Sequence, residues 1–137
     1  MIITGKYPSL RLRRNRKSDW IRRLTEESNL SVNDLILPIF LTGGKNKIQK
    51  IKNMPGVFRY SIDKIPTILD RAVKNSIPMV ALFPYTNIKL KNPSGDESLN
   101  ENNLVCRAIR FIKKKYRNDI GIMCDVALDP YTSHGHD

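Results

Sequence analysis

Three continuous apolar runs, separated by two segments of helical periodicity, constrain the fold of this chain more than any other feature. The apolar runs span residues 34–41, 79–83 and 120–128, and the helical segments span residues 63–75 and 104–116. Such runs are typical of strands buried on both faces, and the helical segments repeat apolar side chains at the 3.6-residue period. The order strand, helix, strand, helix, strand predicts an α/β fold with a parallel sheet and right-handed crossovers.

Capping and turn residues set the expected ends of these elements. Asp63 is the expected cap of the first of these helices, and Pro84 is expected to end the second strand. Residues 47–61 are expected to form a loop excursion with a turn at Met54-Pro55-Gly56-Val57. The excursion therefore separates the first strand from the first helix of the repeating unit.

Residues 1–30 form a polar arm ahead of the first strand. One helix is expected there, starting near the cap candidate Ser18 and carrying Trp20, Ile21 and Leu24. An arm this polar has too little apolar surface to fold alone. We therefore expect it to lie on another subunit or on the outside of the main domain, residues 31–137.

Three parallel strands with helices on one side fit either a small open sheet or the first part of a (β/α)8 barrel, which takes about 250 residues. In an isolated sheet, strands apolar on both faces would leave one face uncovered, and the first and third strands would be bare edges. We therefore expect an N-terminal arm plus the first three strands of a TIM barrel that is incomplete in this chain.

Composition excludes several other classes of protein. The chain has 137 residues, of which 40% are hydrophobic, and its longest apolar run is far shorter than the roughly 20 residues of a membrane helix. The N-terminus lacks the apolar core of a secretory signal. Cys106 and Cys124 form no disulfide framework and fit a reducing compartment. We expect a soluble cytoplasmic protein with no membrane partner.

The net charge of +11 raises the alternative of a basic nucleic-acid-binding module. Seven cations lie between residues 11 and 23 against the single acid Asp19, enough to bind phosphates if they share one face. However, only Tyr7 and Trp20 flank this segment, so the aromatic side chains that stack on bases are missing from it. We expect no nucleic-acid partner, although a binding module would show salt-sensitive affinity.

The strongest candidate site lies where the third strand ends. Its candidate ligands and acid–base groups are three carboxylates and two imidazoles, from Asp125, Asp129, Asp137, His134 and His136. Such clusters at the exit of a strand are where α/β proteins usually carry chemistry. On an extended strand, residues 125, 127 and 129 share one face, so the first two carboxylates are expected to point into the same space. Cys124 then lies on the opposite face, in the core.

Structural roles compete with the functional ones in this loop. Asp129 precedes a proline and fits an Asx turn, and the two histidines fit hydrogen bonds that hold the loop as well as metal ligation. Thr132 and Ser133 have no paired base, which argues against a hydrolase nucleophile. A small metal-dependent hydrolase built on the Asp and His side chains stays open as an alternative.

Several separated motifs resemble the porphobilinogen synthase family, also called delta-aminolevulinic acid dehydratase. The motifs are residues 125–137, Arg11-Leu12-Arg13-Arg14-Asn15, Asp34-Leu35-Ile36, Pro38-Ile39-Phe40, Met54-Pro55-Gly56-Val57 with Arg59 and Ser61, Leu82-Phe83-Pro84 and Arg107-Ala108-Ile109-Arg110. They occur in the family's order along nearly the whole chain. The chain therefore resembles the N-terminal part of a member of this family.

The resemblance implies an enzyme of tetrapyrrole (heme) biosynthesis, a hydro-lyase that condenses two molecules of 5-aminolevulinate into porphobilinogen with loss of two waters. It also implies a TIM barrel whose arm embraces a neighbour in a homo-oligomer, an octamer or a hexamer, with Arg11, Arg13 and Arg14 as subunit-contact candidates. The family binds its substrates as Schiff bases on two lysines of later strands, and no lysine of this chain corresponds to them. The 137-residue chain alone is therefore expected to be inactive.

The resemblance also indicates which metal the complete enzyme uses. Zinc-dependent members carry cysteines at the positions of Ala127, Asp129 and Asp137, whereas this sequence offers a methyl group and carboxylates. Oxygen ligands suit Mg²⁺ better than Zn²⁺, so the chain resembles the zinc-independent branch, with Asp129 and Asp137 as metal candidates. Asp125 matches an active-site aspartate of the family and is the catalytic candidate. Ser133 joins the two metal candidates as a residue of the substrate or metal loop.

Overall fold

The computed structural model describes residues 5–11 and 13–136, and the chain divides into two units, residues 1–30 and 31–137. In the first unit, a short 3₁₀ helix, η1 (Arg14–Arg16), precedes helix α1 (Asp19–Leu24). Ser18 holds the N-cap position as expected, but its side chain makes no capping hydrogen bond. Trp20 is 62% exposed and Leu24 76% exposed, so the described residues of this unit have no apolar core of their own.

The second unit is built on a five-stranded sheet in the order β2-β3-β1-β4-β5. The strands are β1 (Ile36–Thr42), β2 (Ile48–Lys50), β3 (Phe58–Tyr60), β4 (Met79–Tyr85) and β5 (Gly121–Cys124). Strand β4 pairs in parallel with β1 and with β5, which confirms the predicted parallel arrangement of the three apolar runs. Strand β3 pairs in parallel with the other edge of β1, and β2 pairs antiparallel with β3.

The prediction that residues 47–61 form only a loop was wrong, because β2 and β3 both lie in this segment. Each strand has only three residues, and all three residues of β2 are exposed, so neither strand is long enough for an alternation or an apolar run to mark it in the sequence. The predicted turn between them is correct. Val57 N–H donates to Met54 C=O across 3.1 Å, and Gly56 takes a φ of 80° that favours glycine.

The ends of the other strands also differ from the prediction. The first begins at Ile36 because Asp34 closes a 3₁₀ turn, η2 (Val32–Asp34), with its carboxylate accepting from Ser31 N–H at 2.8 Å. Strand β4 continues through Pro84 to Tyr85. Strand β5 pairs with β4 only as far as Leu82, so beyond this residue β4 has a neighbouring strand on one side only. A proline, which has no N–H to donate, is tolerated in such a position.

Two helices supply the second layer, α2 (Pro66–Lys74) and α3 (Leu104–Tyr116). The expected cap of α2 was wrong: Asp63 lies in a preceding 3₁₀ turn, η3 (Ile62–Lys64), and Pro66 opens the helix. The Asp63 carboxylate instead accepts from Ser61 Oγ at 2.8 Å and from Asn46 N–H at 2.9 Å, which lowers the pKa of Asp63. Helix α3 has the predicted bounds, and the Asn103 side chain caps it by accepting from Cys106 N–H at 2.8 Å.

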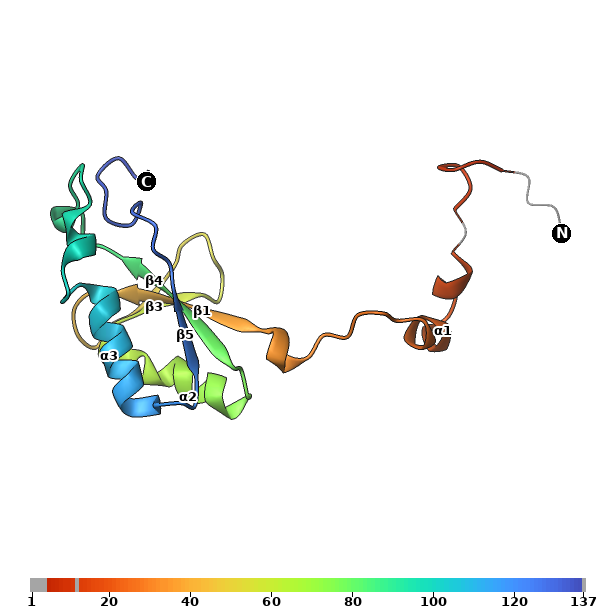
Figure 1. The fold of residues 1–137 in the computed structure, drawn as a ribbon, viewed down its shortest axis with the longest axis horizontal. Helices are drawn as coiled ribbons and strands as arrows, with labels where there is room; N and C mark the ends of the chain where they lie inside the picture. The colour runs from red at the N-terminus through yellow and green to blue at the C-terminus, as the bar shows by residue number, and fades with distance from the viewer. Residues whose placement is uncertain (1–4, 12, 137) are drawn as a thin grey trace. The chain divides into compact units, whose positions relative to one another are not determined.

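Both helices pack on one face of the sheet (Figure 1). The buried cluster joins residues of β1, α2, β4 and α3: Ile39, Leu41, Leu69, Ala72, Val80, Leu82, Val105, Ala108 and Ile112. Alternate residues of the strands point to the other face, where Ile36 and Met123 are 46% and 44% exposed. None of the described helices covers this second face, although its side chains are apolar.

A hydrogen bond ties the last residue of α3 to the middle of α2. Tyr116 of α3 is buried, and its hydroxyl donates to Asp70 Oδ1 of α2 across 2.6 Å. Burial, followed by the neighbouring carboxylate, raises the pKa of Tyr116 well above its ordinary value. The protonated phenol is therefore the form that the folded state selects.

We expect Tyr116→Phe to lower the free energy of unfolding by about 1 kcal/mol at pH 8. Because the pKa of Tyr116 is higher in the folded state, its stabilising effect is complete below the unfolded value of about 10 and is lost as the pH rises above it. Urea unfolding at pH 8 and pH 11 should show the difference between wild type and variant shrinking. Tyr7→Phe, at an exposed tyrosine, is the control, and an equal response of both variants would contradict the assignment.

Across the part of the chain that the structure describes, no helix combines the length and the hydrophobicity that crossing a bilayer requires. The longest helix, α3, has 13 residues and ends in Lys113, Lys114 and Lys115.

Candidate functional site

A small cavity of about 260 Å³ opens at the carboxyl end of the sheet, on the face that the helices leave free. Its lining comes from three strands and two loops: Phe40, Arg59, Phe83, Pro84, Tyr85, Lys91, Asp125, Asp129, Pro130 and Tyr131. In parallel α/β sheets this edge is where ligands bind. The two carboxylates predicted to point into one space therefore do share a cavity, at the expected edge.

The strands build the apolar wall of this cavity by alternation. Phe40 of β1 and Phe83 of β4 are opposite each other in the register, with ring centroids 5.6 Å apart. Their neighbours Leu41 and Leu82 point to the helices and are buried in the core. On the rim, the Arg59 guanidinium of β3 lies 4.3 Å from the ring centroid of Tyr85, a cation–π contact that orients the cation.

Asp125 follows directly after β5 and turns the chain. Its Oδ1 accepts a hydrogen bond from Ala127 N–H at 3.1 Å, the geometry of an Asx turn. The predicted strand to residue 128 was therefore wrong, since β5 ends at Cys124 and residues 125–128 belong to no strand. The two carboxylates share the cavity because the loop bends, and not because residues 125 to 129 alternate on a strand.

Asp129 lies in the next turn, which Tyr131 N–H closes by donating to Leu128 C=O at 2.8 Å. The backbone carbonyl of Asp129 accepts from Lys91 Nζ at 3.3 Å. This contact brings an ammonium group into a cavity that already holds two carboxylates. Charges of both signs therefore line the cavity, with Arg59 and Lys91 as cations and Asp125 and Asp129 as anions.

The loop after β4 holds the loop after β5 in place, and Figure 1 shows the two loops side by side beyond the strands. Asn92 pairs with Thr132 in an isolated parallel bridge, and Ser133 N–H donates to Asn92 C=O at 2.9 Å. A ring nitrogen of His134, Nε2, is 3.2 Å from Pro93 C=O. The geometry of the candidate site therefore depends on residues 91–93 as well as on its own loop.

The two histidines have structural partners. His134 Nδ1 accepts from His136 N–H at 3.2 Å, and with Nε2 facing a carbonyl the neutral tautomer protonated on Nε2 satisfies both contacts. The two rings stack with centroids 6.0 Å apart. Within residues 5–11 and 13–136, no three His, Cys, Asp or Glu side chains come together as a metal site. The contacts of His134 agree with the interpretation in which the histidines hold the loop.

The remaining predicted residues lie apart from this cavity or outside the described chain. Ser133 is exposed and lines neither this cavity nor the larger one described below, and Asp137 lies outside the described residues. Arg11, Arg13 and Arg14 belong to the first unit, so their role at a subunit contact stays a prediction. Cys124 is only partly buried, although it packs against the core as expected.

Burial also shapes the titration of two groups near the cavity. Desolvation, helped by the neighbouring Cys106, raises the pKa of the Cys124 thiol, so this thiol is a poor metal ligand or nucleophile at neutral pH. Burial raises the pKa of the Tyr131 phenol in the same way. Both groups therefore stay protonated, and carboxylates are the anionic side chains that line the cavity.

Sequence reasoning missed Arg59, Tyr85 and Lys91 as cavity residues. They come from segments far from residue 125 in the sequence, and only the pairing of β3 with β1 and the bridge between the two loops bring them to the same place. The face alternation of β3 and β4 would have flagged Arg59 and Tyr85 if β3 had been recognised as a strand.

A parallel sheet with charged side chains converging at its carboxyl edge defines the class of α/β proteins that carry a ligand site there. Residues 9–137 match the profile of the family described as delta-aminolevulinic acid dehydratase, and the chain belongs to this family.

Relatives and a solved structure agree with this membership. The chain is 53% identical to the delta-aminolevulinic acid dehydratase of Bradyrhizobium diazoefficiens over 94% of its own length and 36% of the relative, and 42% identical to that of Chlamydia pneumoniae over 94% and 39%. The Toxoplasma gondii ME49 enzyme, solved in complex with its reaction product porphobilinogen, superimposes with a TM-score of 0.82 and 35% identity, over 93% of this chain and 36% of that one. The chain thus spans little more than a third of these proteins.

Proposed function

We propose that the protein carrying this chain is a porphobilinogen synthase, which condenses two molecules of 5-aminolevulinate into porphobilinogen and releases two waters in tetrapyrrole biosynthesis. The observation that carries the proposal is the shared cavity of Asp125 and Asp129 at the carboxyl edge of the sheet, in a chain of this family. The cavity offers carboxylates for an amine and cations for a carboxylate, and 5-aminolevulinate has both groups.

The uncovered face of the sheet supports a larger architecture. We infer that it is the inner face of a TIM barrel whose later strands close against the edges of this sheet, because its exposed side chains are apolar and its strands are parallel. On this reading, the cavity opens into the barrel mouth. The Schiff-base lysines belong to those later strands, and the chain by itself is inactive.

The carboxylates have distinct proposed roles. Asp125 is the catalytic candidate, which stabilises the ammonium form of the substrate amine or relays its proton, and Lys91 positions the Asp129 turn through the backbone carbonyl. We also propose a cytoplasmic homo-oligomer whose contacts include Arg11, Arg13 and Arg14.

Mg²⁺ fits the chemistry of this edge better than Zn²⁺, because the anionic side chains among the described lining residues are carboxylates, and none of these residues is a cysteine. Among the described residues, Asp125 and Asp129 supply the two carboxylates of the cavity. The proposed ligand pair for the metal is Asp129 and Asp137, of which Asp137 lies outside the described residues. A bound Mg²⁺ would supply positive charge next to the substrate. This reading assigns the chain to the zinc-independent branch of the family.

The test is turnover of 5-aminolevulinate by the full-length protein, with porphobilinogen measured by its colour reaction with an aromatic aldehyde. We expect turnover in the purified protein, a loss of at least about tenfold after EDTA treatment, and recovery with Mg²⁺ but not with Zn²⁺. Absence of porphobilinogen under all metal conditions would overturn the proposed function. Recovery with Zn²⁺ alone would overturn only the assignment to the zinc-independent branch.

A further inference from the structure

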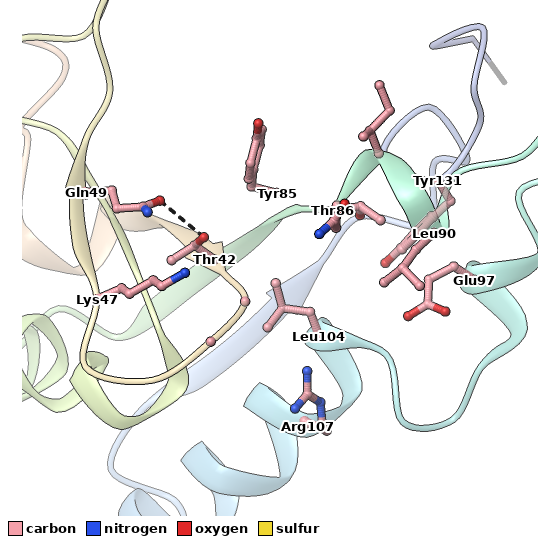
Figure 2. A pocket seen from close by; sticks show the side chains of 14 residues that line it. Thr42, Lys47, Gln49, Tyr85, Thr86, Leu90, Glu97, Leu104, Arg107 and Tyr131 are labelled. Atoms are coloured by element: carbon pink, nitrogen blue, oxygen red, sulfur yellow. Dashed lines mark hydrogen bonds between the residues drawn. The ribbon is translucent and has the colours of Figure 1, made fainter.

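A second and larger cavity, of about 630 Å³, adjoins the first one (Figure 2). It is lined by the end of β1 and the loop after it, by the segment after β4, and by the first turns of α3. Tyr85 and Tyr131 line both cavities, whereas none of the charged residues is shared between them. Its volume falls in the range of about 300–1,000 Å³ that small-molecule sites occupy.

Two cations face this cavity, Lys47 and Arg107. Figure 2 shows Lys47 on one wall and Arg107 on α3 at the other side. Lys47 runs closely over Gly44: a Cβ there would lie 2.9 Å from Lys47 Cε and 3.0 Å from Nζ, so glycine permits this path. Among the described residues, neither cation forms an ion pair, which leaves both charges available to a ligand.

A buried hydroxyl adds a donor that has no partner within the described chain. Thr86 Oγ1 lies in the wall of the cavity, is inaccessible to solvent in this structure, and makes no hydrogen bond to any described residue. The other threonine of the lining, Thr42, does have a partner, since its hydroxyl is 3.3 Å from Gln49 Oε1. Because an unpaired buried hydroxyl is costly, a ligand with an acceptor group would favour a rotation of the Thr86 side chain that turns its hydroxyl toward the cavity.

The electrostatic balance of the cavity favours an anion. Its one carboxylate, Glu97, already accepts a hydrogen bond from Asn100 Nδ2 at 3.1 Å. Helix α3 begins at this wall, and the N-terminal end of a helix carries partial positive charge. Two cations, a helix start and a free hydroxyl donor therefore outweigh one carboxylate.

The lining also has an apolar part, and Figure 2 shows Leu104 near Arg107 and Leu90 beside Tyr131. We propose that this cavity is a second ligand site, separate from the Asp125 cavity, which binds a small organic anion: the positive charges of Lys47 and Arg107 attract its oxyanion group, Thr86 is a further donor to it, and its apolar body lies on the leucines. The oxyanion is a carboxylate or a phosphate ester, which share this chemistry.

The experiment uses the full-length protein and four probes, three with a phenyl ring and one without. Phenyl phosphate and phenylacetate carry the two oxyanions, benzyl alcohol is the uncharged control, and inorganic phosphate tests the charge alone. Affinities are measured by ligand-observed NMR at low and at physiological salt, in wild type and in K47Q, R107Q and T86V. The matched controls are R110Q, on α3 but outside the lining, and K50Q, on exposed β2.

We expect phenyl phosphate or phenylacetate to bind at least about tenfold more tightly than benzyl alcohol. The anion that binds more tightly identifies the oxyanion. K47Q and R107Q should each weaken that anion about five- to tenfold and T86V a few-fold, with both controls within twofold of wild type. Equal binding of benzyl alcohol, or equal losses in R110Q and K50Q, would overturn the proposal. If circular dichroism shows that T86V does not fold, K47Q and R107Q still decide the outcome. Turnover of 5-aminolevulinate does not enter this test.

Discussion

Replacing Asp125 by alanine in the full-length protein should lower the turnover of 5-aminolevulinate at least about 100-fold, because proton transfer by a positioned side chain contributes that much or more. The carboxylate lines the cavity together with Asp129, Arg59 and Lys91, so its loss removes an anion from a site that holds two cations. The measurement is kcat and KM for porphobilinogen formation. Asp119→Ala, at an exposed carboxylate in the turn before β5, should leave both constants within twofold.

Asp125→Asn separates the two roles that the structure gives this residue. The asparagine side chain keeps an oxygen that can accept from Ala127 N–H and so preserves the turn, but it carries no charge and cannot relay a proton. If the carboxylate is catalytic, the asparagine variant should be as impaired as the alanine variant. Recovery of near-normal kcat in Asp125→Asn would show that the residue acts through the turn alone, and unchanged turnover in both variants would remove Asp125 from the mechanism.

The elements that the sequence predicted well are those with a pattern of their own. Strands β1 and β4 are continuous apolar runs, helix α3 repeats its apolar side chains at the 3.6-residue period, and all three contribute to the buried core. Strands β2 and β3, with three residues each, are too short for a pattern to identify them, and they owe their pairing to the turn at Met54 and to the edge of β1. Their existence depends on tertiary contacts that no local signal records.

The candidate site was also predicted in part: its two carboxylates were expected, but the bend of the loop and the cation Lys91 were not. Asp125 and Asp129 were expected in one cavity, and they are, although the loop bends where an extended strand was assumed. An aspartate side chain that accepts a hydrogen bond from the backbone N–H two residues later stabilises a turn in place of an extended strand, and Asp125 forms such a turn. Lys91 escaped prediction because its place depends on the bridge between Asn92 and Thr132.

Strand β4 serves the core and the site with alternate residues, so the two functions can be separated by mutation. Leu82 is 1% exposed and packs among β1, α2 and α3, whereas Phe83 points the other way and lines the cavity. Leu82→Ala should therefore lower the free energy of unfolding by about 2–5 kcal/mol, through lost burial and the void it leaves. Urea unfolding followed by far-UV circular dichroism checks this value.

The matched control for Leu82→Ala is Leu99→Ala, because Leu99 is 83% exposed and should change the free energy of unfolding by less than about 0.5 kcal/mol. In the full-length protein, below the unfolding transition, Leu82→Ala should keep most of the turnover of 5-aminolevulinate per folded molecule, since the Leu82 side chain faces the helices and not the cavity. Equal destabilisation by the two variants would mean that the helix-covered face is not the core of this domain. A selective loss of turnover with full stability would mean that the two faces of β4 are assigned the wrong way round.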